Sequence, residues 1–131
     1  MEIPWTTVGR APTGHDAQIM ASRFRLRSAW RSPQFLMYSI RILRQVRSSQ
    51  GILGVSLRAY PLRGTFWTLS AWTDEEALRA FARADPHRTI IRNIRAWAEE
   101  ATFRFWTVPA DTLGSRELWA DAGTRIEGPP E

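Results

Sequence analysis

The chain has 131 residues, of which 44% are hydrophobic and 24% charged, and this size and composition predict one soluble domain with a single core. No apolar run is long enough to cross a membrane, and the N-terminus lacks the pattern of a signal peptide, so we expect a cytoplasmic protein. All 18 basic residues are arginine, there is no cysteine, and the histidines are His15 and His87. A Schiff-base lysine, a thiol nucleophile, a disulfide and a thiolate metal site are therefore excluded, and we expect neither metal nor cofactor.

Charge divides the chain into three parts. No aspartate or glutamate occurs from Ala17 to Thr73, whereas the tail after Pro109 is acidic. Proline and glycine punctuate both ends. We predict an N-terminal arm (1–16), a folded body (17–108) and a loosely held C-terminal extension (109–131).

The first half of the body predicts a strand, a helix and a hairpin. Ile19–Arg27 alternates with period two, with apolar residues on one face and arginines on the other. Ser32 and Pro33 then start a helix that ends before Gly51. The β-rich runs Ile52–Tyr60 and Thr65–Trp72 are joined by a short turn typical of a hairpin.

The second half predicts two helical segments and a last strand. Thr73 and Glu76 match a capping box, in which the threonine side chain caps the helix and the glutamate reaches back. Asp85 and Pro86 indicate a second cap followed by a proline in the first helical position, and a helix that runs through Trp97. Glu100–Val108 reads as the closing strand.

This order of elements predicts the fold class. Strand, helix, strand, strand, helical segment and strand fit an α+β, ferredoxin-like split βαβ sandwich with an antiparallel sheet and both helices on one face. The third and last strands carry large apolar groups on both sides, so the second face of the sheet must also be covered. We therefore predict a homodimer that closes sheet against sheet.

One stretch carries a family resemblance. At the run from Phe66 to Phe81, followed by Asp85-Pro86-His87-Arg88, the sequence resembles the antibiotic-biosynthesis monooxygenase-like superfamily. In that group a third strand ending in tryptophan leads directly into a helix with an acidic cap, and a step of the form S/D-x-H-R precedes a further helix. The likeness covers residues 17–108. It implies a dimeric α+β barrel with a pocket in each subunit, and members that include cofactor-independent oxygenases of polyphenols, isomerases, cyclases and haem-degrading oxygenases.

The haem-degrading branch does not fit this sequence. The resemblance would require an asparagine on the first strand, a tryptophan on the second helix and a histidine ten residues after it. Phe81 and Ile91 occupy the last two positions, and the first strand has no asparagine. We therefore expect a cofactor-independent monooxygenase of an aromatic or polyketide-like molecule, with a cyclase or isomerase, or a non-catalytic ligand-binding protein, as alternatives.

Three residues are candidates for catalysis. His87 is the only histidine in the body, and it can act as the base that deprotonates a phenol or enol, or simply cap a helix. Arg23 and Arg25 share one face of the first strand. They can bind and stabilise an anion inside the barrel, or they can reach solvent or pair with Glu99 and Glu100.

Aromatic residues are candidates for substrate binding, although each also fits the core or the dimer interface. They are Tyr38, Tyr60, Trp67, Trp72 and Trp106. We expect an aromatic or anionic small molecule as partner, and neither nucleic acid nor membrane: the base-stacking pattern of RNA-binding sheets is missing, and the basic helix face reads as solvated.

Overall fold

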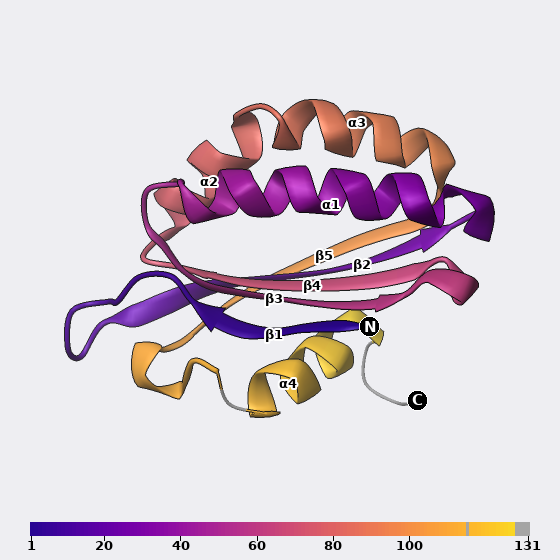
Figure 1. Ribbon diagram of the computed structural model, residues 1–131. Helices are drawn as coiled ribbons and strands as arrows, with labels where there is room; N and C mark the ends of the chain where they lie inside the picture. The colour runs from indigo at the N-terminus through magenta and orange to yellow at the C-terminus, as the bar shows by residue number, and fades with distance from the viewer. Residues whose placement is uncertain (115, 128–131) are drawn as a thin grey trace.

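The computed structural model describes residues 1–114 and 116–127 and places one antiparallel sheet between helices on both of its faces (Figure 1). The strands are β1 (Glu2–Thr7), β2 (Asp16–Leu26), β3 (Ile52–Tyr60), β4 (Thr65–Trp72) and β5 (Ala98–Pro109). Their order in the sheet is β1-β3-β4-β2-β5. The helices are α1 (Ser32–Arg47), α2 (Glu75–Arg83), α3 (His87–Trp97) and α4 (Arg116–Glu127), with 3₁₀ turns η1 (Ala29–Arg31), η2 (Pro61–Arg63) and η3 (Ala110–Thr112).

The predicted α+β class and ferredoxin-like arrangement are confirmed. β2 and β4 are central and pair antiparallel with each other, β5 flanks β2, and β3 flanks β4. α1, α2 and α3 lie on the same side of this sheet (Figure 1). The bounds of β3 and β4 coincide with the two runs predicted as a hairpin.

The three predicted helices begin within one residue of the predicted positions, but each N-cap lies one residue from the predicted one: Arg31 for α1, Asp74 for α2 and Pro86 for α3. Asp74, not Thr73, caps α2, because its carboxylate accepts a hydrogen bond of 2.8 Å from the backbone N–H of Ala77. Before α3, Asp85 accepts hydrogen bonds from the backbone N–H and the hydroxyl of Thr89. The hydroxyl bond in particular holds the pKa of Asp85 below its usual range.

Both ends of the chain carry ordered elements that the predicted arm and loose extension did not include. β1 lies within the arm and pairs antiparallel with β3, so it becomes an edge strand of the sheet. α4 lies within the extension and packs on the second face of the sheet (Figure 1). The sequence signal for both elements is weak because each is short and half apolar.

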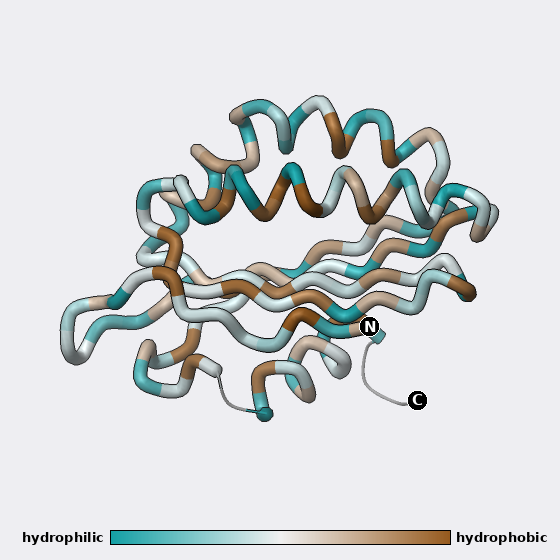
Figure 2. Tube along the Cα trace, viewed as in Figure 1, coloured by the Kyte–Doolittle hydropathy of each residue, from teal (hydrophilic) through white to brown (hydrophobic). Residues whose placement is uncertain are grey.

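Apolar residues fill the space on each side of the sheet. Figure 2 shows hydrophobic stretches along the strands between the two helical layers. On the side of α1 to α3, Phe35 stacks on Phe66 with ring centroids 4.1 Å apart and packs against Phe24 at 5.3 Å. On the other side, α4 supplies Leu118, Ala122 and Ile126 to a core that includes buried residues of β2, β4 and β5.

The second face is therefore covered by the chain's own helix. This is the face that the sequence predicted to close against a second copy. Leu118 and Ala122 of α4 share one buried cluster with Ile19, Leu69 and Trp106 of the sheet. In the part of the chain that the structure describes, no helix is long and apolar enough to cross a membrane.

Candidate functional site

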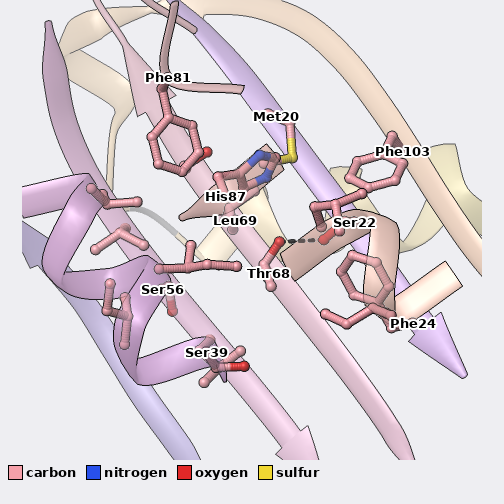
Figure 3. Close-up of a pocket in the computed structure, with 18 of the residues that line it drawn as sticks. Met20, Ser22, Phe24, Ser39, Ser56, Thr68, Leu69, Phe81, His87 and Phe103 are labelled. Carbon is pink, nitrogen blue, oxygen red and sulfur yellow. Dashed lines mark hydrogen bonds between the residues drawn. The ribbon is translucent and has the colours of Figure 1, made fainter. Parts of the chain in front are cut away.

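A cavity of about 70 Å³ lies between the sheet and α1, α2 and α3 (Figure 3). Its wall is mostly apolar, with side chains from β2, β3, β4, β5 and all three helices. Among the described residues that line it, none carries a carboxylate or a guanidinium. Its polar side-chain groups are the imidazole of His87 and a few hydroxyls. The cavity is thus suited to a neutral ligand.

His87 begins α3 and turns its ring into this cavity (Figure 3). Its backbone N–H donates to the side-chain oxygen of Gln45 at 2.8 Å, which fixes the start of the helix against α1. The Nδ1 atom of the ring lies 3.2 Å from the carbonyl oxygen of Ala82. The ring itself packs against the ring of Phe81, with centroids 4.6 Å apart. A carbonyl can only accept, so Nδ1 carries the proton and Nε2 keeps a free lone pair.

Burial lowers the pKa of His87 below its ordinary value of 6.5, and the hydrogen bond to Ala82 opposes this shift only in part. The ring is therefore neutral at physiological pH. A neutral imidazole with an unoccupied Nε2 is the form that accepts a proton. The prediction that His87 can serve as a base has the required tautomer and charge in this structure.

Two hydroxyls on the cavity floor form a pair. Ser22 of β2 and Thr68 of β4 are cross-strand neighbours, and their side-chain oxygens are hydrogen-bonded to each other (Figure 3). One of the two protons is used within the pair, and no other acceptor for either hydroxyl is found in residues 1–114 and 116–127. The remaining O–H can donate to a ligand in the cavity.

Two other hydroxyls of the wall donate to backbone carbonyl oxygens. Ser39 donates to Phe35 at 2.9 Å, and Ser56 donates to Ile3 at 2.8 Å. Ser70 accepts from the indole N–H of Trp72 at 2.9 Å, and no acceptor for its own O–H is found within the described residues. The Ser22–Thr68 pair and Ser70 are therefore the hydroxyl groups that can still donate to a ligand in the chamber.

A surface cleft of about 320 Å³ adjoins the cavity. The two spaces share Met20, Phe81, His87 and Phe103 as lining residues. On its outer side the cleft is lined by polar residues such as Glu75. His87 thus lies where the cavity and the cleft meet.

The structure does not bring Arg23 and Arg25 together with His87. Successive residues of a strand point to opposite faces, and because Ser22 and Phe24 face the cavity, both arginines face α4. Arg23 forms a two-pronged ion pair with Glu100, with N–O distances of 2.6 and 3.1 Å. The expectation of an anion-binding role beside the base is corrected, and the alternative pairing with Glu100 is what the structure contains.

Arg23 makes two further contacts on that face. Its guanidinium carbon lies 5.1 Å from the ring centroid of Trp67, and one nitrogen lies 3.6 Å from Glu127 of α4. The hydrogen bond from Arg23 lowers the pKa of Glu100. These contacts tie β2, β5 and α4 together, so Arg23 has a structural role.

None of the five aromatic residues predicted to bind substrate lines the cavity. Trp67 and Trp106 face α4, and the guanidinium of Arg125 covers Trp106 at 4.7 Å. Trp72 is buried behind Phe81 with ring centroids 4.9 Å apart. Tyr38 stacks on Trp97 at 5.5 Å, and Tyr60 is exposed at the end of the sheet. Their core and surface positions correct this prediction.

The cavity residues that were not predicted from the sequence include Ser22, Thr68, Phe81 and Phe103. A signal for Ser22 was present, because it alternates with Arg23 and shares a face with Met20 and Phe24. Nothing in the sequence distinguishes Thr68 from other strand threonines. Its role appears only through the register that pairs it with Ser22.

Comparisons with known proteins agree with this fold. Among solved structures, the chain is similar to SnoaB, a cofactor-independent oxygenase from Streptomyces nogalater, with a TM-score of 0.60 and 18% identity over 71% of this chain and 93% of that one. It is also similar to a Nitrosomonas europaea protein that has the provisional name antibiotic biosynthesis monooxygenase, with a TM-score of 0.61 and 11% identity over 75% and 92% of the two chains. A conserved protein from Methanosarcina mazei gives a TM-score of 0.62 and 13% identity over 69% and 90%.

These identities establish a shared fold, and at this level the resemblance to the antibiotic-biosynthesis monooxygenase-like group is confirmed. No match was found among proteins of curated function. The sequence profile of a family described as a domain of unknown function, DUF3291, matches residues 42–128, from the second half of α1 to the end of α4. Because this match spans more than half of the sequence, the chain belongs to the DUF3291 family.

Proposed function

We propose that this protein is a cofactor-independent monooxygenase of a small aromatic or polyketide-like molecule, and that His87 is its base. The observation that carries the proposal is the neutral imidazole whose free Nε2 faces an apolar cavity. The fold shared with SnoaB, itself a cofactor-independent oxygenase, supports the reaction class. The substrate then needs a C–H or O–H acidic enough for an imidazole to remove.

Deprotonation is the first step. Nε2 of His87 takes the proton, and the electron pair moves onto the substrate as an enolate or phenolate. The O–H left over from the Ser22–Thr68 pair donates to this oxygen. A donor aimed at developing charge in an apolar chamber stabilises the transition state more than it would in water.

The substrate alone supplies the electrons that reduce dioxygen. For an activated methylene group, the carbanion bonds to dioxygen, and the resulting peroxide takes back the proton from the His87 imidazolium. Loss of water then leaves a carbonyl group where the methylene stood. One oxygen atom ends in product and one in water, and all four electrons come from the methylene carbon.

The cavity also narrows the substrate class. A volume of about 70 Å³ is smaller than most ligand sites, so the reactive end of the molecule enters the cavity and the remainder lies in the adjoining cleft. No guanidinium reaches this chamber among the described residues, because Arg23 and Arg25 lie across the sheet. The charged residues of the cleft, Arg79 and Glu75, pair with each other. We therefore propose a neutral substrate in place of the organic anion that the strand arginines had suggested.

A homodimer remains part of the proposal. The strands with large apolar groups on both sides that led to this prediction are present, but α4 occupies the second face. A second copy would therefore contact the outer side of α4 or the free edge of β5, where Phe105 is 56% exposed. Sedimentation velocity on the whole chain tests this, and a monomer at micromolar concentration would remove the homodimer.

Oxygen uptake with anthrone, a flat neutral ketone with an activated methylene, tests the reaction. We expect uptake by the wild type and a loss of about 100-fold or more in His87→Gln. Ser39→Ala is the matched control, because this cavity hydroxyl is engaged within α1 and should be dispensable. Full activity in His87→Gln would overturn the mechanism.

The same assay separates the two alternatives. A cyclase or isomerase would use the same base without dioxygen, so it would exchange the methylene hydrogens in D₂O without oxygen uptake. A non-catalytic ligand-binding protein would bind anthrone with neither exchange nor uptake. Either result would exclude oxygenation of anthrone by this protein.

A further inference from the structure

Two neighbouring loop tips at one end of the sheet expose large apolar side chains. η1 presents Trp30, which is 89% exposed, and η2 presents Leu62, which is 96% exposed. Both turns lie at the end of the sheet where β2 finishes and β3 turns into β4 (Figure 1). Tyr60, the last residue of β3, is 43% exposed at the same end. Isolated exposed apolar residues are common, but two such tips side by side indicate an interaction surface.

The two tips are held in place by the fold. The hydroxyl of Ser32, at the start of α1, donates to the carbonyl oxygen of Pro61 at 2.6 Å and so joins η1 to η2. The backbone N–H of Leu26 donates to the carbonyl oxygen of Gly64 at 2.8 Å. Gly64 closes η2 with a positive φ of 65°, which favours glycine. Trp30 and Leu62 are thus presented by a fixed platform.

The surface around the tips is basic. Arg27, Arg31 and Arg63 are all exposed, and none of them forms an ion pair within the described residues. Both loops belong to the stretch from residue 17 to residue 73, which contains no acidic residue. Of the acids near this end within the described residues, Glu99 is exposed, whereas Glu100 and Glu127 lie beside Arg23 and Glu2 is paired with Arg58.

We propose that this end of the molecule docks on an anionic lipid surface. Trp30 and Leu62 enter the interfacial region of the bilayer, and the three arginines contact lipid phosphates. Tryptophan favours the membrane–water interface, and basic residues beside an apolar anchor add attraction to anionic headgroups. Self-association through this surface is disfavoured because a two-fold interface would place the same basic rim opposite itself. The single protruding anchors also form no groove for a folded partner.

The absence of membrane-spanning segments and the basic face of α1 led to the prediction of no membrane partner. The proposed surface instead combines two loops that are far apart in the sequence and adjacent only in the fold. The proposed surface lies at the end of β2 away from Gln18 and Met20, which line the cleft, so docking leaves the cleft open.

Co-sedimentation with vesicles of equal parts phosphatidylcholine and phosphatidylglycerol tests the proposal on the whole chain. We expect binding that weakens as salt is added and is lost on vesicles of phosphatidylcholine alone. The double variant Trp30→Ser/Leu62→Ser should bind at least about tenfold more weakly. Both side chains are exposed, so the variant should fold, which circular dichroism verifies.

Matched control variants test whether the position of the exposed apolar and basic side chains matters, and not only their number and type. Val8→Ser/Ile40→Ser removes two exposed apolar side chains elsewhere and should bind as the wild type does. Arg63→Gln should weaken binding by about fivefold, whereas Arg47→Gln, at the far end of α1, should not. Three results would overturn the proposal: no vesicle binding, equal loss in both double variants, or a change of oligomeric state in Trp30→Ser/Leu62→Ser without vesicle binding. Salt-sensitive binding to single-stranded RNA with none to vesicles would equally overturn it.

Discussion

The apolar residues on the two faces of the sheet are buried in different ways. On the side of α1 to α3, large side chains leave a cavity whose polar groups, among them His87 and the Ser22–Thr68 pair, are neutral. On the side of α4, small residues such as Ala21 allow a close approach, and charge appears at the margin as the Arg23–Glu100 pair. A single strand, β2, supplies both faces through alternate residues.

This difference explains why chemistry is expected on one face only. An incompletely filled, uncharged chamber can admit a ligand and keep a base neutral. A filled face that is tied down by ion pairs can do neither. In this chain α4 closes the second face of the sheet.

The largest predicted effect concerns the closure by α4. Leu118→Ala should lower the free energy of unfolding by about 2–5 kcal/mol, because the side chain is buried against the sheet. Urea denaturation monitored by circular dichroism measures it. A loss below about 0.5 kcal/mol would mean that α4 is undocked in solution. In that case the second face would be free for another subunit.

A second prediction uses changes of similar size on opposite faces. Ala21→Val adds methyl groups to the filled face and should destabilise the protein by about 1–3 kcal/mol. Val55→Ile adds one methyl group beside the cavity and should be neutral or slightly stabilising, because space is available there. Thermal unfolding of both variants checks the contrast. Equal destabilisation would show that the cavity is filled in solution.

The sequence predicted the body of the fold well and the site only in part. Period-two alternation in β2 and the turn residues around β3 and β4 are local signals, so these strands were placed correctly. β1 and α4 were missed because their apolar residues make sense only against a sheet assembled from distant segments. Their omission led directly to the idea of a bare second face.

The site shows the same division. His87 was found because it is a rare residue type at a helix start, which is a local feature. Arg23 and the tryptophans were assigned by residue type, but their function depends on which face they occupy. The sequence had predicted the faces of β2 correctly, yet it could not tell which face encloses the cavity. That depends on where α4 packs.

A third prediction tests the ion pair on the α4 face. Glu100→Gln should lower stability by about 1 kcal/mol at neutral pH, since the pair with Arg23 is partly buried. The pKa of Glu100 is lowered in the folded state, so its contribution is present above its ordinary pKa of 4.5 and is lost as pH falls through the folded value. Wild type and variant should therefore converge in acid. A difference that persists in acid would assign the effect to packing.

The smallest predicted effect on stability comes from His87 on the cavity face, and it occurs in a higher pH range than the effect of Glu100. Burial lowers the pKa of His87, so between the folded value and the ordinary 6.5 the unfolded chain binds a proton that the folded chain does not. Stability should fall as pH drops through that window and level off below the folded value. His87→Gln should remove this component while leaving the lower window of Glu100 intact. Denaturant titrations from neutral pH downward measure both slopes. The same lowered pKa keeps Nε2 free to accept a proton. Oxygen uptake should therefore begin to fall only when the pH is below the ordinary pKa of histidine. An activity midpoint at or above pH 6.5 would show that His87 is exposed during turnover.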